Sequence, residues 1–137
     1  SIDPNFSYIH YSLSWIYGLK GMYPEAILEA RRSIELNPDP TAKAYLALWL
    51  AKAGQRAEAI KLLDQLKQES TEGYVQSYAF ALIYLGLDDK EEAFRWLEKE
   101  ISDRGFHANF FGVYPELDPL SSDPRFKSML KQLNLPE

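Results

Sequence analysis

The stretch Gly21-Met22-Tyr23-Pro24-Glu25-Ala26-Ile27-Leu28-Glu29-Ala30 decides the fold, because its pattern returns twice. A glycine is followed, after a short gap, by Glu-Ala and a helix face of small or apolar residues. The second copy is Gly54-Gln55-Arg56-Ala57-Glu58-Ala59-Ile60, and the third is Asp88-Asp89-Lys90-Glu91-Glu92-Ala93-Phe94. The shared alanines are 33 and 34 residues apart. A period of about 34 residues with two helices per unit predicts an all-α superhelical array of three helical hairpins, an architecture that binds other polypeptides.

The composition excludes several other classes of protein. The 137 residues are 46% apolar and carry a net charge of −5, with both signs scattered along the chain. Because nucleic-acid binding needs a basic patch, we expect no DNA or RNA partner. The absence of cysteine excludes disulfides and thiolate chemistry. There is no apolar run of about 20 residues and no signal peptide, so we expect a soluble, cytoplasmic chain without a membrane partner.

The beginning of the chain resembles a later junction between repeats. Ser1-Ile2-Asp3-Pro4-Asn5 is similar to Glu35-Leu36-Asn37-Pro38-Asp39, and the two prolines are 34 residues apart. We therefore expect residues 1–6 to be the tail of a preceding repeat, truncated from a longer protein at a repeat boundary. An ordinary capped N-terminus that happens to match is the alternative.

Helix signals divide the remaining chain into units. The first hairpin is expected at about 7–19 and 24–36, and the near-continuous apolar surface of 7–19 predicts a helix that neighbours cover on several sides. Asp39 and Asp123 are expected N-caps, and Asp89-Lys90-Glu91-Glu92 fits a capping box. The predicted units are repeats at 7–39, 40–73 and 74–105, an aromatic irregular connector at 106–122, and a C-terminal capping helix at 123–137.

These three units resemble tetratricopeptide repeats over residues 7–105. In the first helices, the family's small residue and the large residue before it correspond to Ser14, Ala47 and Ala81, and to Leu13, Leu46 and Phe80. The apolar position near the end of those helices corresponds to Tyr17, Leu50 and Tyr84, the second-helix alanine to Ala26, Ala59 and Ala93, and the closing proline to Pro38. The sequence departs from the family pattern at Ser14, Asp88, Ser33, Leu66 and Glu100.

The C-terminal part adds a second resemblance. From Ala81 onward the chain is similar to the C-terminal ends of bacterial multidomain regulators, in which tetratricopeptide arrays follow winged-helix, nucleotide cyclase or serine/threonine kinase domains. The resemblance implies a regulatory or scaffolding module. It does not indicate which effector domain would precede this chain.

Candidate catalytic groups are few. His10 and His107 are 97 residues apart, and neither has an acid or a second histidine at a ligand spacing. We expect His10 to pack between paired helices and His107 to lie at the surface or at a junction. Two exposed helix ion pairs are predicted, Glu91 with Arg95 and Glu58 with Lys61. We therefore predict a protein that is not an enzyme and holds no cofactor and no metal.

The resemblance implies that partner contacts come from the first helix of each hairpin. Transferred to this chain, the concave face comprises Tyr8, Tyr11, Trp15, Ala44, Tyr45, Leu48, Val75, Tyr78, Ala79 and Leu82. The family members that clamp a C-terminal carboxylate use lysine, asparagine and arginine there, so these residues disfavour that kind of partner. An apolar face instead predicts a protein or peptide anchored by hydrophobic side chains.

An aromatic segment after the third hairpin leaves three interpretations open. It contains Phe106, Phe110, Phe111, Val113 and Tyr114. The segment could fold into the groove or seal the end of the array, leave an open peptide groove, or form a homodimer contact. Two functions follow from these alternatives: an interaction module of a signalling or transcription-regulating protein, or a structural cap or dimerisation element without a ligand of its own.

Overall fold

The computed structural model describes residues 4–135, and over this range the chain is all-α. The expected helix tail at residues 1 and 2 lies outside the described residues, as does the end of the chain at 136–137. The α-helices are α1 (Pro4–Leu19), α2 (Tyr23–Leu36), α3 (Pro40–Lys52), α4 (Arg56–Glu72), α5 (Ser77–Gly86), α6 (Lys90–Ser102) and α7 (Pro124–Gln132). Two 3₁₀ helices, η1 (Phe106–Phe110) and η2 (Pro115–Leu120), precede α7.

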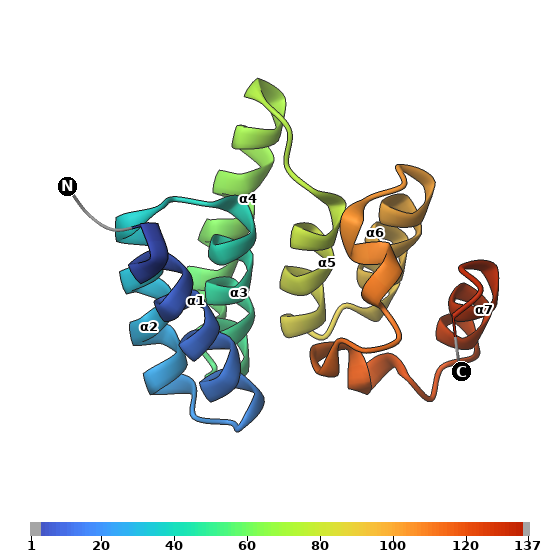
Figure 1. Cartoon of the computed structure of the whole chain (residues 1–137), viewed down its shortest axis with the longest axis horizontal. Helices are drawn as coiled ribbons and strands as arrows, with labels where there is room; N and C mark the ends of the chain where they lie inside the picture. The colour runs from blue at the N-terminus through green and yellow to red at the C-terminus, as the bar shows by residue number, and fades with distance from the viewer. Residues whose placement is uncertain (1–3, 136–137) are drawn as a thin grey trace.

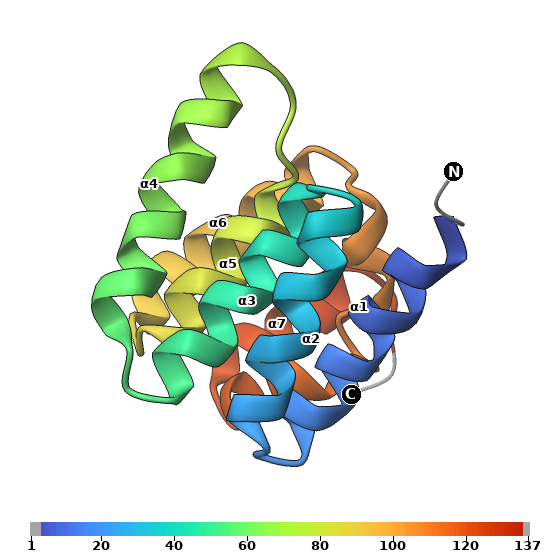
Figure 2. The same cartoon turned by 90° about the vertical axis from the view of Figure 1, so that its left-hand side faces the viewer.

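The first six helices form three hairpins that stack side by side (Figures 1 and 2). Helix α1 packs on α2, α3 on α4, and α5 on α6, while α3 also contacts α2 and α5. Helix α4 is the longest helix within residues 4–135, and its C-terminal end projects beyond the body of the molecule in Figure 2. The predicted all-α array of three hairpins followed by a C-terminal helix is confirmed.

The turns inside the hairpins share one backbone geometry, which explains the repeated glycine. Gly21 and Gly54 have φ of 77° and 88°, and the third turn places Asp88 at 61°. In each turn the residue after the positive-φ position donates its N–H to the carbonyl five residues back, over 2.8 to 2.9 Å, as Met22 does to Tyr17. This is the Schellman end of a helix, which favours glycine because it has no Cβ. The prediction for Gly54 is confirmed.

The predicted N-caps are confirmed. Asp39 accepts a hydrogen bond from the N–H of Ala42 at 3.1 Å, and Asp123 caps α7 in the same role. Asp89 accepts from the N–H of Glu92 at 3.2 Å. The other predicted contact of the capping box, in which Glu92 reaches back to Asp89, is wrong. The carboxylate of Glu92 binds the guanidinium of Arg95 instead.

Both predicted helix ion pairs are also replaced by contacts between helices. Glu91 of α6 binds Arg125 of α7 at 2.9 Å, and Glu58 of α4 binds Arg31 of α2 at 2.8 Å. Each side chain therefore connects two helices instead of two turns of its own helix. The guanidinium of Arg125 also lies over the ring of Phe94, 4.2 Å from its centroid, so α7 is docked on α6.

The centre of the core is formed by α3 and α5, not by α1. Most residues of α3 and all but one of α5 are buried, including Trp49 and Tyr78. The expectation that neighbours cover the first helix on several sides is wrong, since Tyr8, Ile9 and Ile16 are exposed. The physical reason is position: α1 forms one end of the described array, whereas α3 lies between the first and third hairpins (Figure 1). Helix α5 packs on α3 and α6, and rings of the connector cover Tyr78 on it.

Two serines that depart from the repeat pattern connect α1 to α2. Ser14 donates its hydroxyl to the carbonyl of Ala26 at 2.8 Å, and Ser33 donates to the carbonyl of Ser7 at 3.1 Å. Both serines are buried. The departures therefore supply specific polar contacts between the paired helices.

The connector is more regular than predicted. The interpretation of residues 106–122 as irregular is wrong, because η1 and η2 occupy most of the segment. It runs beside α5 and α6 and then leads to α7 (Figure 1). Leu117 and Leu120 of η2 are buried in the same core as the hairpins. Over residues 4–135, no helix is both long and apolar enough to cross a membrane.

Candidate polypeptide-binding site

The ten proposed partner-binding residues do not form one open groove. The five that are completely buried are Ala44, Leu48, Tyr78, Ala79 and Leu82, and two more, Tyr45 and Val75, are 6% and 9% exposed. Leu48 packs against α5, since a Cβ built on Gly86 would lie 3.1 Å from its Cα. The proposal of an open groove across all three hairpins therefore needs correction, because α3 and α5 use these faces to pack. Accessible surface remains at Tyr8, Tyr11 and Trp15.

The aromatic connector lies directly on this face. The ring of Tyr78 stacks on His107 with 4.6 Å between centroids, and Phe111 and Tyr114 lie 6.0 and 5.3 Å away. Phe111 is 1% exposed. Of the three interpretations of this segment, the structure shows the one in which it folds onto the concave face.

Glu116 of η2 is the polar centre of the face. Its carboxylate is buried and accepts three hydrogen bonds, from the indole Nε1 of Trp15 at 3.1 Å, the hydroxyl of Tyr78 at 2.9 Å, and the hydroxyl of Tyr45. The donors come from α1, α5 and α3, so each hairpin contributes one. Within residues 4–135 no ion pair involves Glu116. Neutral hydrogen-bond donors therefore satisfy the carboxylate.

Burial keeps these phenols protonated. It raises the pKa of Tyr45 and of Tyr78 well above the ordinary value, and the nearby Glu116 charge raises both further. Burial likewise raises the pKa of Tyr11, whose ring packs edge-on against Tyr45 at 5.6 Å. The hydroxyls of Tyr45 and Tyr78 are therefore fixed as donors at physiological pH.

A second buried carboxylate attaches the connector to the third hairpin. Glu100 is completely buried, and it accepts from the backbone N–H of Tyr78 at 3.1 Å and of His107 at 3.2 Å. It therefore ties the first turn of α5 to the first turn of η1. A Cβ on Gly105 would lie only 2.0 Å from Oε2 of Glu100, so this position requires glycine for close approach.

His107 is a junction residue held in one tautomer. Because the Oε1 of Gln76 accepts only, Nε2 of His107 donates to it at 2.7 Å, and Nδ1 accepts from the Tyr114 hydroxyl at 2.9 Å. Burial lowers the pKa of His107, although nearby carboxylates oppose the shift, and burial raises the pKa of Tyr114 to about 12. His10 contacts the Glu29 carboxylate between α1 and α2, in the packing position expected for it.

An open cleft remains between α1 and η1. It has a volume of about 520 Å³ and is lined by Tyr8, Tyr11, Ser12, Trp15, Ile16, Tyr45, Phe106, His107 and Tyr114. Tyr8 and Phe106 are 71% and 62% exposed at its rim. The predicted residues Tyr8, Tyr11, Trp15 and Tyr45 are therefore brought together here, with three connector residues opposite them.

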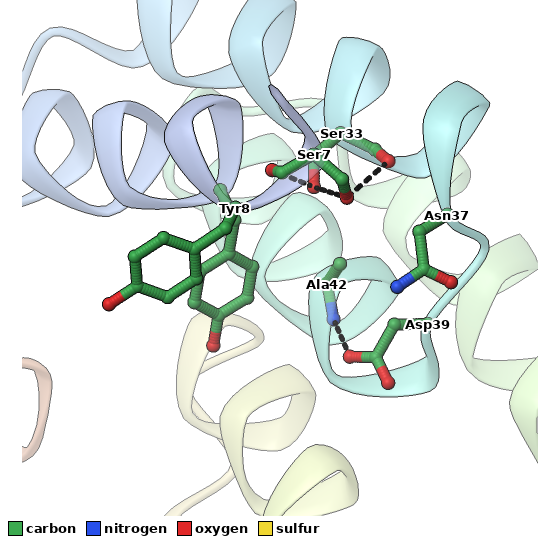
Figure 3. A pocket seen from close by; sticks show the side chains of 7 residues that line it. Ser7, Tyr8, Ser33, Asn37, Asp39 and Ala42 are labelled. Atoms are coloured by element: carbon green, nitrogen blue, oxygen red, sulfur yellow. Dashed lines mark hydrogen bonds between the residues drawn. The ribbon is translucent and has the colours of Figure 1, made fainter. Parts of the chain in front are cut away.

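A smaller depression of about 220 Å³ continues the cleft on the other side of Tyr8 (Figure 3). Its walls are polar, with Ser7 and Ser33 hydrogen-bonded to each other and Asp39 occupied in capping α3. Asn37 also lines it, and Figure 3 shows its amide near Asp39. An apolar cleft with a few polar groups is the usual make-up of a ligand-binding site.

Sequence reasoning missed Glu116 altogether and treated Glu100 only as a departure from the repeat. The sequence contained a usable signal for Glu100, because a charged residue occupies a repeat position where a small residue is usual. Glu116 carried none, since the donors that surround it are 38 or more residues away in the sequence.

No group of three or more His, Cys, Asp or Glu side chains in residues 4–135 could hold a metal ion. No family model, curated protein or solved structure matches the chain.

Proposed function

We propose that this chain is a protein–protein interaction or scaffolding module of the tetratricopeptide type, belonging to a larger bacterial signalling or transcription-regulating protein. It binds polypeptide at the cleft between α1 and η1. The observation that carries the proposal is the exposure of large aromatic rings around one cleft, with Tyr8 71% and Phe106 62% exposed. Apolar surface gathered at a concave site favours a docking role.

The cleft has enough apolar surface for a specific complex. Burying one large apolar side chain contributes roughly 1.5–3 kcal/mol, so two or three anchors give about micromolar affinity after the costs of association. Tyrosine and tryptophan suit this task, because each presents a broad ring with few rotatable bonds and a polar group at its edge. Tyr8, Tyr11 and Trp15 supply such surface on successive turns of α1.

The proposal can be tested by selecting, from a displayed library of random dodecapeptides, those that bind the immobilised full chain. The chain offers a matched control, because Tyr74 is also 71% exposed but lies at a different depression, near α6. We expect enriched peptides to carry apolar anchors and to bind Tyr8→Ser at least about tenfold more weakly, a loss of about 1.4 kcal/mol. Tyr74→Ser should bind them unchanged. Equal binding to all three proteins would refute the assignment of the cleft.

A specific observation favours a second function, a structural cap or homodimerisation element without a separate ligand. The connector and α7 bury Leu120, Phe126 and Leu130 against the array. Terminal repeats need such cover to remain soluble. If selection enriches no peptide, sedimentation of the full chain over a concentration series distinguishes a monomeric cap from a dimer.

A further inference from the structure

The contacts of Glu116 divide into a fixed socket and a separate occupant. The socket is the set of three donors, Trp15 Nε1, Tyr45 Oη and Tyr78 Oη, which stand on three helices of the array. The occupant stands on a six-residue 3₁₀ helix in the connector. The socket belongs to the repeat scaffold, whereas Glu116 reaches it as a peptide ligand would.

The donor arrangement selects a carboxylate. Oε1 of Glu116 accepts from Trp15, and Oε2 accepts from both tyrosines, so both oxygens are used. An amide of the same shape would offer one oxygen and one NH₂ group. If the NH₂ group faced Trp15, two donors would meet, and if it faced the tyrosines, their hydroxyls would have to accept and their own protons would lose an acceptor. If Glu116 withdraws, three donors lose their acceptor in a largely buried site, which favours another carboxylate over an empty socket. A charged clamp of lysine and arginine is not involved.

The socket is accessible from the open cleft. Trp15 and Tyr45 bind Glu116 and also line the cleft, together with Tyr114 of the connector. A polypeptide seated in the cleft therefore lies beside two of the three donors. It reaches the third when η2 moves out of the face.

We propose that Trp15, Tyr45 and Tyr78 form a socket for an internal glutamate side chain of a partner polypeptide, and that the connector is the built-in occupant which this partner displaces. The inference rests on the proposed polypeptide-binding function and names the chemistry recognised. The pattern of the occupant gives that of the ligand: a carboxylate with apolar residues before and after it in the sequence, as Leu117 directly follows Glu116 and Phe111 lies five residues before it. Both residues are almost completely buried.

The indole N–H of Trp15 reports directly on the socket. Trp15 donates to a carboxylate, whereas the buried indole nitrogens of Trp49 and Trp96 have no partner within residues 4–135. In the full chain labelled with ¹⁵N-tryptophan, these two indoles serve as internal controls of folding. We expect Glu116→Gln to move the Trp15 indole resonance upfield and to leave the other two in place.

The ligand probe is a capped peptide of residues 111–121, with a matched peptide that has Gln in place of Glu116. A tethered occupant acts at a local concentration of about millimolar, so the unchanged chain should resist the peptide. The Glu116→Gln chain should bind the glutamate peptide at least about tenfold more tightly than the glutamine peptide, because hydrogen bonds to a charged acceptor are the stronger ones. Binding should return the Trp15 indole resonance downfield.

Three outcomes would overturn the inference. The first is an indole resonance that Glu116→Gln leaves unmoved, and the second is equal or absent binding of the two peptides by the variant. The third is a Glu116→Gln chain that sediments as a dimer and excludes the peptide, which would make a second copy the occupant. None of them decides the proposed function, which depends on the displayed peptides and on Tyr8→Ser.

Discussion

Gly105→Ala tests whether Glu100 fixes the connector to the array. The new Cβ would lie 2.0 Å from Oε2 and 2.3 Å from Cδ of Glu100. Non-bonded atoms prefer separations of about 3.5–4.0 Å, so the carboxylate has to retreat by more than about 1 Å. Its hydrogen bonds from the N–H groups of Tyr78 and His107 are already 3.1 and 3.2 Å long, and this movement breaks them.

The magnitude follows from those two bonds. Each hydrogen bond to a charged group contributes about 1.5–3 kcal/mol, but the carboxylate will recover part of the loss by rotating. Alanine also lowers the conformational entropy of the unfolded chain, and this effect offsets about 0.4–1 kcal/mol of the destabilisation. We therefore expect Gly105→Ala to lower the free energy of unfolding by about 2–3 kcal/mol. For a chain of this length, that corresponds to a fall in Tm of about 8 °C.

Urea unfolding followed by far-ultraviolet circular dichroism measures this change. Gly73→Ala is the matched control, because its φ is −169° and a Cβ there would meet nothing within 4 Å. The free energy of unfolding of Gly73→Ala should remain within about 0.5 kcal/mol of the value for the unchanged chain, as is usual for surface substitutions. In a Glu100→Ala background, where the colliding group is gone, Gly105→Ala should cost less than about 1 kcal/mol. A full-sized loss in that background, or none in the unchanged chain, refutes the reasoning.

Three further predictions concern the array itself. Asp39→Ala removes the N-cap of α3 and should lower the free energy of unfolding by about 1 kcal/mol in the same urea assay. Gly18→Ala places a Cβ 2.3 Å from the ring of the buried Trp49 and should destabilise by about 1–3 kcal/mol, accompanied by a change in tryptophan fluorescence. Burial lowers the pKa of His107, so the unfolded chain binds more protons than the folded chain below about pH 6.5. Stability should therefore fall as the pH is lowered from about 7 through that value, and His107→Gln should remove this part of the pH dependence measured by urea unfolding.

Features that depend on nearby residues could be predicted from the sequence. The left-handed turn at Gly54 and the cap at Asp39 follow from residues within one helical turn, and both are present. The order of the helices follows from the repeat period. The predictions of the ion pairs failed because the observed partners lie far away in the sequence. Glu58 and Glu91 each have a residue of opposite charge on their own helix, but they bind Arg31 and Arg125 of other helices. Sequence spacing does not contain that geometry.

The prediction of an open groove failed because a repeat pattern does not show what covers each helix face. The pattern assigns Leu48 and Leu82 to a concave wall, but both are fully buried in the array. Tyr45 and Tyr78 were assigned to the same wall, and there the connector covers them and their hydroxyls donate to Glu116. The wrong prediction and the missed site therefore both involve the connector.

The two buried carboxylates act together on one segment. Glu100 holds the beginning of the connector through backbone N–H groups, and Glu116 enters the face formed by all three hairpins. Glu100 is completely buried and does not line the open cleft, so a polypeptide seated in the cleft has no access to its contact. The contact of Glu116 depends on a side chain that any polypeptide with a glutamate can offer. If a partner displaces part of the connector, the separable part is therefore η2 with its neighbours, while η1 stays attached to the third hairpin through Glu100.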